Sequence, residues 1–239
     1  MLLISILMAG LAYSCISIGF VMMKRGIDWI GWKGHKTGQY YRNLALWLCG
    51  FIIMNIYGVP SAIALKHLSA HIVAAFSGWG IVLLVFLSHS FLKEKIYSSD
   101  YLYSGLVITG IIALNLLEQD RAGSEPIIIS LILLSIIPFA MCFLSLLPAM
   151  TTKHQTIIWA AVSGLSNALM VVNLKMLVSL YQYDVGRYFK SAYLYLYIGF
   201  ALLSLLALQV AMKKGEMIVI GPVQYSSNIL YPLLASVLV

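Results

Sequence analysis

The chain has 239 residues, of which 62% are hydrophobic and only 10% are charged, and its mean hydropathy is +0.94. A soluble domain carries roughly a quarter charged residues because its surface must face water, so this composition excludes an ordinary soluble globular protein. The net charge of +7 comes mostly from basic residues in the short gaps between apolar runs, which favours contact with lipid headgroups and excludes nucleic acid as an expected partner.

Eight apolar runs predict the helices of the chain. A helix needs about 20 apolar residues to cross the hydrocarbon layer, and helices satisfy their own backbone groups in lipid. The runs are also too long for the strands of a membrane barrel. We therefore expect an all-α integral membrane protein with several spans, placed in the inner or plasma membrane. In chain order the runs are Leu2–Met23, Leu44–Leu65, Ala70–Leu92, Tyr101–Leu117, Ile127–Met150, Ile157–Tyr181, Ala192–Met212 and Met217–Val239.

Basic residues are concentrated in alternate loops between these runs. The gap between the first and second runs alone holds five of them, from Lys24 to Arg42. The loops that would share its side carry Lys93, Lys153 and Lys213, each within a few residues of a helix end. Because basic loops stay on the cytoplasmic side, this distribution predicts that the N-terminus lies outside.

Two pairs of helix ends recur at nearly constant spacing, which indicates an internal repeat. Ala64–His67 ends the second run, and Ala211–Lys214 ends the seventh run 147 residues later. Met22–Lys24 in the first run corresponds to Asn173–Lys175 in the sixth, at a spacing of 151 residues. Equivalent helices are five spans apart, so the two halves are expected to be inverted relative to each other. Inverted repeats of this kind are typical of secondary transporters.

The repeat divides the chain into two halves of unequal content. Residues 1–150 form a first repeat of five helices, and residues 151–239 form a second repeat with three helices. Under the 147-residue spacing, Leu92 corresponds to Val239, and the first half continues beyond this point whereas the second stops. We therefore expect a ten-helix bundle whose second half is incomplete in this chain, with one or two more helices after Val239.

Two neighbouring segments resemble a signature of the drug/metabolite transporter superfamily, also called DMT or EamA-like. The first is Phe91–Lys95, which reads F-L-K-E-K, and the second is Tyr103–Gly110, with Gly105 and Gly110 spaced as in the superfamily. In that superfamily the signature closes the third helix and opens the fourth. The resemblance implies the ten-helix fold and a transport function.

Within this superfamily, the chain is most similar in pattern to the NIPA-like magnesium transporters. The likeness runs over most of the chain, although each motif is short and largely apolar. The residues that carry it are Ser14, Gly19, Lys24 and Gly26 in the first run, Ser163–Asn167 and Lys175 in the sixth, and Gly221–Tyr225 in the eighth. In the sixth run Ser166 stands where the family has a glycine, and the eighth run matches only loosely.

These features predict a secondary transporter that moves a small solute by alternating access between two inverted repeats. Mg²⁺ or another divalent cation is one candidate solute, as the family resemblance implies. The alternative is export of small organic metabolites or drugs, because none of the eight acidic residues lies at the centre of a predicted helix and Mg²⁺ usually binds carboxylates. An integral membrane enzyme that modifies lipids is a third reading. No catalytic motif supports it, so we expect no enzyme activity and no cofactor.

Polar residues within the apolar runs are the candidate solute pathway, because the bilayer penalises them unless they have a role. We expect the partners of the protein to be a small solute or hydrated cation, together with membrane lipids. Ser77 and Gln224 are equivalent under the 147-residue spacing and are expected to face the site as a pair. The predicted pathway residues are Asn55, Ser77, Ser166, Asn167, Asn173, Gln224, Tyr225 and Asn228, and the sequence names no metal ligand.

Some polar residues also have a structural interpretation. Hydrogen bonds that join helices explain Ser77 and Asn55 as well as a solute pathway does. Glu94 is expected to cap a helix or form an ion pair, and Glu216 is expected to support the first turn of the eighth helix, where negative charge is favourable.

Overall fold

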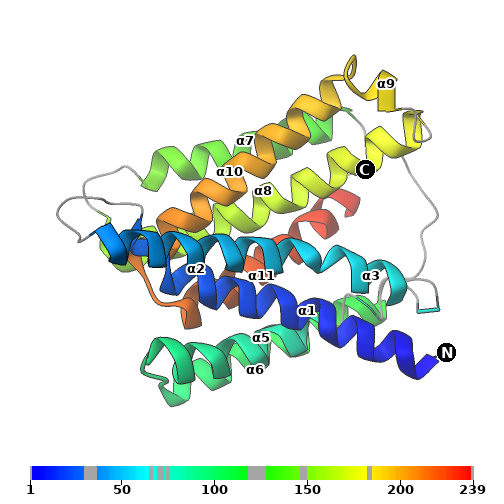
Figure 1. The fold of residues 1–239 in the computed structure, drawn as a ribbon. Helices are drawn as coiled ribbons and strands as arrows, with labels where there is room; N and C mark the ends of the chain where they lie inside the picture. Colours follow the sequence, from blue (N-terminus) through cyan, green and yellow to red (C-terminus); the bar gives the residue numbers. More distant parts are fainter. Residues whose placement is uncertain are drawn as a thin grey trace. The chain divides into compact units, whose positions relative to one another are not determined.

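The described residues of the chain are mostly helical, as expected for an all-α protein. The computed structural model describes residues 2–29, 37–64, 67–68, 73, 76–117, 128–145, 150–181 and 185–237, and no strand occurs among them (Figure 1). The helices are α1 (Leu2–Arg25), η1 (Ile27–Trp29), α2 (Thr37–Ile56), α3 (Gly58–Ala64), α5 (Ser77–Leu87), η2 (Ser88–Leu92), α6 (Ser98–Leu117), α7 (Ile128–Ser145), α8 (Thr152–Tyr181), α9 (Val185–Tyr188), α10 (Ala192–Lys214) and α11 (Met217–Val237).

Over the described residues, each of the eight predicted runs overlaps a helix or a pair of consecutive helices. The second run is divided at Tyr57 into α2 and α3, which the apolar pattern does not reveal. Pro60 explains the break, because it has no N–H to donate to the preceding turn. The third run is described as a helix only from Ser77 onward, and its last turn, η2, is a π-helix.

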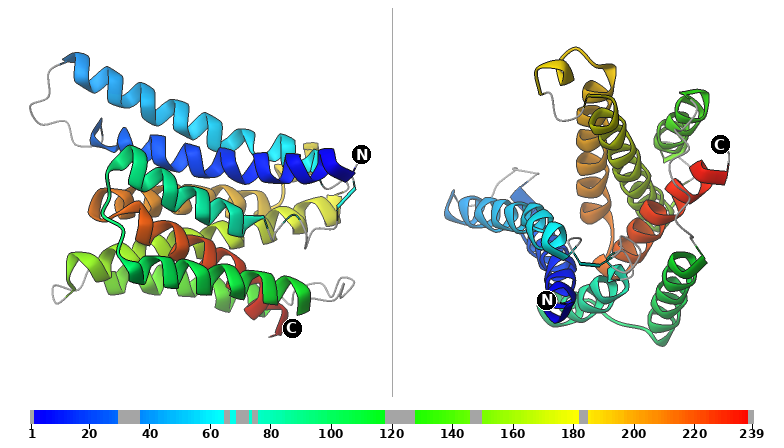
Figure 2. Two further views of the ribbon diagram at one scale, coloured as in Figure 1. Left: turned by 90° about the horizontal axis from the view of Figure 1, so that it is seen from below. Right: turned by 90° about the vertical axis from the view of Figure 1, so that its right-hand side faces the viewer.

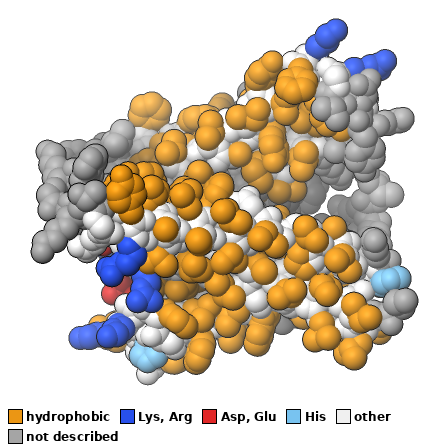
Figure 3. Space-filling view, viewed as in Figure 1, with side chains coloured by type: hydrophobic (Ala, Val, Ile, Leu, Met, Phe, Trp, Pro, Cys, Tyr) orange, Lys and Arg blue, Asp and Glu red, His pale blue; other side chains and the backbone are white. Residues whose placement is uncertain are grey.

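Four helices are long and apolar enough to cross a membrane. These candidate spans are Leu2–Arg25, Gly38–Ala64, Thr152–Leu174 and Ala192–Lys214 among the described residues. Many large apolar side chains of these helices point outward, including Leu7, Ile52 and Leu202, each at least half exposed. Figure 3 shows hydrophobic side chains over much of the face in view, with Lys and Arg gathered toward helix ends. This distribution suits helices that face lipid along their length and headgroups at their ends.

The chain forms two compact units. Unit 1 comprises Met1–Arg121 and Glu216–Pro222, and unit 2 comprises Ala122–Gly215 and Val223–Val239. The helix α11 is therefore shared, because its first residues belong to unit 1 and the remainder belong to unit 2. The units do not coincide with the predicted repeats 1–150 and 151–239, because α7 packs with α8 in unit 2. The repeats remain a prediction about the sequence.

In unit 1, glycines allow α1 and α2 to pack closely. The two helices lie side by side in both views of Figure 2. A Cβ atom added to Gly19 would lie 2.7 Å from the carbonyl oxygen of Gly50, and one added to Gly50 would lie 2.7 Å from the carbonyl oxygen of Gly19. Small residues let helix backbones approach in this way within membranes. The Gly19 of the family pattern therefore has a packing role.

In unit 2, α8 packs along α10 over most of its length. The two helices run beside each other in Figures 1 and 2. Ala168 and Leu169 of α8 and Phe200 of α10 form a buried apolar cluster. Phe139 of α7 adds a tilted ring contact with Phe200 at 6.2 Å. This packing fixes the faces of α8 and α10 that carry the polar side chains described next.

Candidate functional site

Three buried polar side chains from three helices of unit 2 are joined by hydrogen bonds. Ser163 lies on α8, Ser204 on α10 and Gln224 on α11, and we call them the Ser–Gln cluster. The hydroxyl of Ser204 donates to the backbone carbonyl of Ser163 at 2.9 Å, and the two hydroxyl oxygens lie 3.3 Å apart. The amide nitrogen Nε2 of Gln224 donates to the hydroxyl oxygen of Ser163 at 3.3 Å.

The hydrogens of the Ser–Gln cluster have one consistent arrangement. Ser204 uses its only hydrogen on the carbonyl of Ser163, so the hydroxyl of Ser163 donates to the oxygen of Ser204. The amide of Gln224 then donates to Ser163. The cluster thus consists of neutral groups, and both hydroxyl hydrogens are used within it.

A glycine next to the cluster brings α8 and α11 into backbone contact. A Cβ atom added to Gly164 would collide with the carbonyl oxygen of Gln224 and would lie 2.7 Å from the Cβ atom of Ser227. The backbone nitrogen of Asn228 would lie 3.1 Å from it. Only a residue without a side chain fits here without displacement. Gly164 therefore sets the position at which Gln224 meets α8.

Two polar atoms at this place have no hydrogen-bond partner among the described residues: Oε1 of Gln224 and Oγ of Ser166. Gln224 is 8% exposed and Ser166 is fully buried. Ser166 follows Ser163 by three residues on α8, which places the two serines on neighbouring positions of one helix face. A buried polar atom without a partner costs about 1–3 kcal/mol, so it calls for an additional group that binds it.

The other predicted pathway residues of unit 2 lie on the same helices. Asn228 follows Gln224 by one turn of α11 and is half-buried, as is Asn167 on α8. Tyr225 is buried beside Gln224. Asn173 is buried further along α8, where its amide donates to the carbonyl of Leu169 at 2.8 Å. Asn173 thus forms a hydrogen bond within its own helix, which is a structural role.

The two predicted pathway residues of unit 1 differ from each other. Asn55 is exposed, and its amide donates to the carbonyl of Phe51 in its own helix at 2.7 Å. Ser77 is 2% exposed, and its Oγ has no hydrogen-bond partner in the described part of the chain. The predicted pairing of Ser77 with Gln224 joins residues of different units and stays a prediction.

In unit 1, a serine joins α1 to α5 near Ser77. The hydroxyl of Ser17 donates to the carbonyl of Gly80 at 2.7 Å, and Nε1 of Trp79 donates to the hydroxyl of Ser14 at 3.1 Å. The hydrogen bond of Ser17 joins these two helices of unit 1 within one turn of Ser77.

A second polar feature of unit 1 is the carboxylate of Glu94, which caps a helix, one of the two roles that the sequence predicted, and the helix is the distant α11. Its two oxygens accept the backbone N–H groups of Met217 at 2.8 Å and Ile218 at 3.0 Å. Burial raises the pKa of the Glu94 carboxyl above its ordinary value, while the two backbone donors and the ammonium of Lys24 act in the opposite direction. The charged carboxylate is therefore stabilised by these partners, although burial removes part of its hydration.

The described residues offer no conventional metal centre. Among them no three His, Cys, Asp or Glu side chains lie close enough together to hold a metal ion. None of the eight acidic residues falls within the four candidate spans. The cluster therefore provides neutral hydrogen-bonding groups for a ligand.

Sequence reasoning identified Gln224 and Ser166 but not Ser204. Ser204 is the one hydroxyl residue in the apolar segment Leu202–Leu206, and a serine in such a place usually donates to a backbone carbonyl of its own helix. Only its proximity to Ser163 makes it part of the cluster. Comparison of the chain with protein-family models, curated proteins and solved structures finds no match.

Proposed function

We propose that this protein is a membrane transporter that carries a small uncharged or zwitterionic solute, and that the Ser–Gln cluster binds this solute. The observation that carries the proposal is the free Oε1 atom of Gln224, buried among helices that include two candidate spans. A polar side chain is costly within a membrane, so its burial there with an open acceptor points to a ligand. The hydroxyl of Ser166, one turn along α8 from Ser163, would be a second contact for the same ligand.

The chemistry of the cluster selects the class of solute. In the hydrogen arrangement of the cluster, Oε1 of Gln224 needs a hydrogen-bond donor, and Ser166 can donate or accept. Amino, amide and hydroxyl groups of small organic solutes provide such donors. Mg²⁺ remains the second candidate because of the NIPA-like pattern. It ordinarily binds carboxylates, and the cluster has none.

Alternating access between two inverted repeats is the mechanism that we propose for this transport. The recurring helix ends at Ala64–His67 and Ala211–Lys214, 147 residues apart, support the repeat. Exchange of two packings between such halves would change the exposure of a solute site. The resemblance of Phe91–Lys95 and Tyr103–Gly110 to the drug/metabolite transporter signature supports the same proposal.

Counterflow in liposomes containing the purified protein tests this proposal. Liposomes loaded with serine, glycerol or urea are diluted into the same labelled solute, and a parallel set contains a Mg²⁺ indicator. We expect accumulation of at least one organic probe with wild-type protein and none with empty liposomes. Flux of Mg²⁺ alone would favour the second candidate. Absence of flux for all four probes would overturn the proposal, and chemical conversion of a lipid without flux would indicate an enzyme.

A further inference from the structure

The first turn of α11 obtains its hydrogen-bond partners from a distant part of the chain. A helix begins with backbone N–H groups that have no partner within the helix, and a neighbouring side chain usually supplies one. In α11 the N–H groups of Met217 and Ile218 instead donate to Glu94, which lies 123 and 124 residues earlier. The next N–H, of Val219, donates to the carbonyl of Glu216 at 3.2 Å. The first turn of α11 is thus completed by Glu94.

The segment that presents Glu94 is itself held in place. The backbone N–H of Glu94 donates to the carbonyl of Ser88 at 3.3 Å, and the ring nitrogen Nδ1 of His89 lies 3.0 Å from the carbonyl oxygen of Glu94. Lys93, between them, has a left-handed backbone with φ of 58°, which a residue with a side chain adopts at a cost. A costly conformation that persists is imposed by its surroundings, so the position of Glu94 is well determined.

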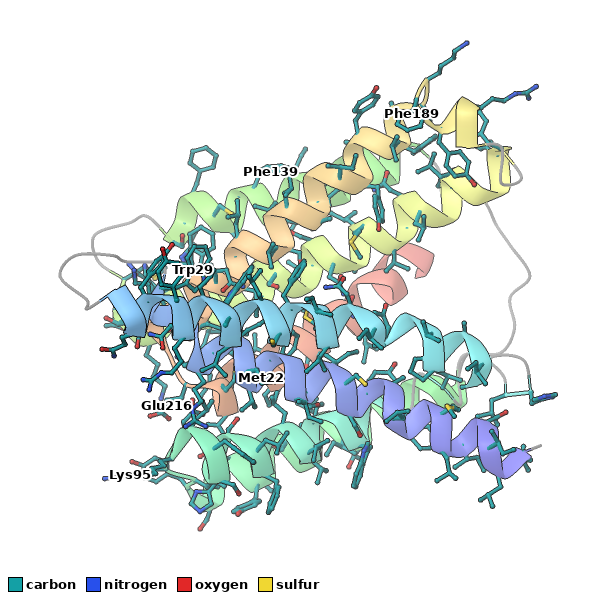
Figure 4. All side chains as sticks on the ribbon, viewed as in Figure 1. Met22, Trp29, Lys95, Phe139, Phe189 and Glu216 are labelled. Carbon is teal, nitrogen blue, oxygen red and sulfur yellow. The ribbon has the colours of Figure 1, made fainter. Side chains whose placement is uncertain are left out.

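The surroundings of Glu94 are charged on several sides. Lys24 at the end of α1 attracts the carboxylate, and Glu216 before α11 repels it. Figure 4 places Glu216 and Lys95 toward the same end of unit 1 as Trp29. A buried charge contributes little to stability once its loss of solvation is counted, but it constrains geometry strongly. Glu94 therefore fixes where α11 begins more than it adds to the free energy of folding.

The helix that Glu94 fixes is the one that carries Gln224. Gln224 follows Met217 by seven residues on the continuous helix α11, which is about 10 Å or two turns along the axis. Rotation or sliding of the first turn would change the direction in which Gln224 points. Gly221, just after this turn, packs closely against α5, because a Cβ atom added there would collide with the side chain of Leu84.

We propose that Glu94 is a positioning residue for solute binding: its two hydrogen bonds to the start of α11 set the orientation of Gln224. The inference rests on the proposed function in one respect only, namely that Gln224 binds the solute. Removing the hydrogen bonds should loosen α11 as far as Gln224, whereas a cap with only a local role would loosen the first turn alone.

The test uses Glu94→Ala, which removes both acceptors, and Glu94→Gln, which keeps one oxygen and lacks the charge. The matched control is Asp100→Asn. Asp100 is a carboxylate of the same unit whose Oδ2 accepts the N–H of Tyr97 at 2.8 Å and caps α6 locally. Each variant is made in full-length protein in which Cys15, Cys49 and Cys142 are replaced by Ala and Gln224 is replaced by Cys. Amide hydrogen exchange and the rate of thiol labelling by N-ethylmaleimide are then measured.

We expect Glu94→Ala to raise the exchange rate of the first turn of α11 about tenfold, as for the loss of a strong helix cap, and to raise the labelling rate at position 224 by a similar factor. Glu94→Gln should give a smaller change in both, and Asp100→Asn should change neither. Faster exchange in the first turn with an unchanged labelling rate at position 224 would overturn the inference. An effect of Asp100→Asn equal to that of Glu94→Ala would overturn it as well. If Glu94→Ala does not fold, the comparison of Glu94→Gln with Asp100→Asn decides.

The liposome assay separates this inference from the proposed function. For an organic probe that the wild-type protein carries, Glu94→Gln with Gln224 intact should raise the half-saturating concentration at least fivefold, with similar maximal flux per folded protein. An unchanged half-saturating concentration would contradict the positioning role. Failure of every probe with the wild-type protein would count against the proposed function, while the labelling experiment still decides whether Glu94 orients position 224.

Discussion

The hydroxyl of Ser17 on α1 donates to the backbone carbonyl of Gly80 on α5 at a distance of 2.7 Å. Ser17 is fully buried, and its oxygen also lies 3.0 Å from the carbonyl of Tyr13 in its own helix. A small polar residue here allows the two helices to approach closely and joins them by a hydrogen bond. In unit 2, Gly164 of α8 makes a comparable close contact with α11.

Replacing Ser17 should reveal how tightly α1 and α5 fit. Ser17→Ala removes one interhelical hydrogen bond and should lower the free energy of unfolding by about 0.6 kcal/mol. Ser17→Val adds bulk at a fully buried position and should cost about 1–3 kcal/mol. Unfolding in detergent measures both. Ile18→Ala, at a neighbouring exposed position, is the control and should stay within about 0.5 kcal/mol of wild type. A Ser17→Val protein as stable as wild type would contradict the close packing.

Gly164 and Gly199 form a matched pair of glycines within helices of unit 2. Gly164→Ala places a methyl group against Gln224 and Ser227 and should destabilise the protein by about 1–3 kcal/mol. Gly199→Ala meets nothing within 4 Å and should stabilise α10 by about 0.5–1 kcal/mol, because alanine favours the helix. Thermal unfolding of both variants under the same conditions checks the prediction. Equal effects would show that α8 and α11 are not in close contact at Gly164.

Replacing Gln224 with Leu should weaken solute binding while leaving a folded protein. Leucine has a similar volume, but it lacks the free Oε1 and the hydrogen bond to Ser163. Loss of these contacts should weaken binding of the transported solute by about ten- to a hundredfold, corresponding to about 1–3 kcal/mol. The measurements are counterflow and the elution profile of the purified protein. Asn55→Leu is the control, because Asn55 is exposed and bonds only its own helix. Wild-type flux in Gln224→Leu would refute the site assignment.

Lys93 and Lys95 allow a test of the left-handed turn before α6. Lys93→Gly should raise the free energy of unfolding by about 1 kcal/mol, because glycine adopts a φ of 58° without strain. Lys95→Gly has no such strain to relieve and should lower stability by a few tenths of a kcal/mol through the added freedom of the unfolded chain. The two thermal midpoints should therefore move in opposite directions. Movement in the same direction would refute the strained turn.

Several features of the fold follow from local sequence. The eight apolar runs coincide with helices because burial of an apolar helix in lipid depends on the composition of the run and not on its neighbours. The role of Glu94 as a cap was also predictable, because a carboxylate just after an apolar run has few other functions in a membrane protein. The division of the second run at Tyr57 was predictable only in part, since Pro60 is compatible with either a bend or a break.

The candidate site was predictable residue by residue but not as an arrangement. Gln224 and Ser166 stand out as polar residues in apolar runs, and the structure buries both. Asn55 and Asn173 stand out equally, yet each amide donates to a carbonyl in its own helix. Ser204 gives no signal in the sequence because serine within a helix commonly bonds its own backbone. Which polar residues are joined depends on the rotation of each helix, and short-range patterns do not specify it.

The sequence by itself determined that this chain is helical and apolar enough for several membrane spans, because composition and periodicity act along the chain. Only the tertiary structure decided that Glu94 caps α11 rather than a helix near to it in sequence. The tertiary structure also decided that Ser163, Ser204 and Gln224 form one cluster. The reason is physical: these contacts join residues at least 41 positions apart, and the packing of small residues such as Gly164 determines which helix faces meet.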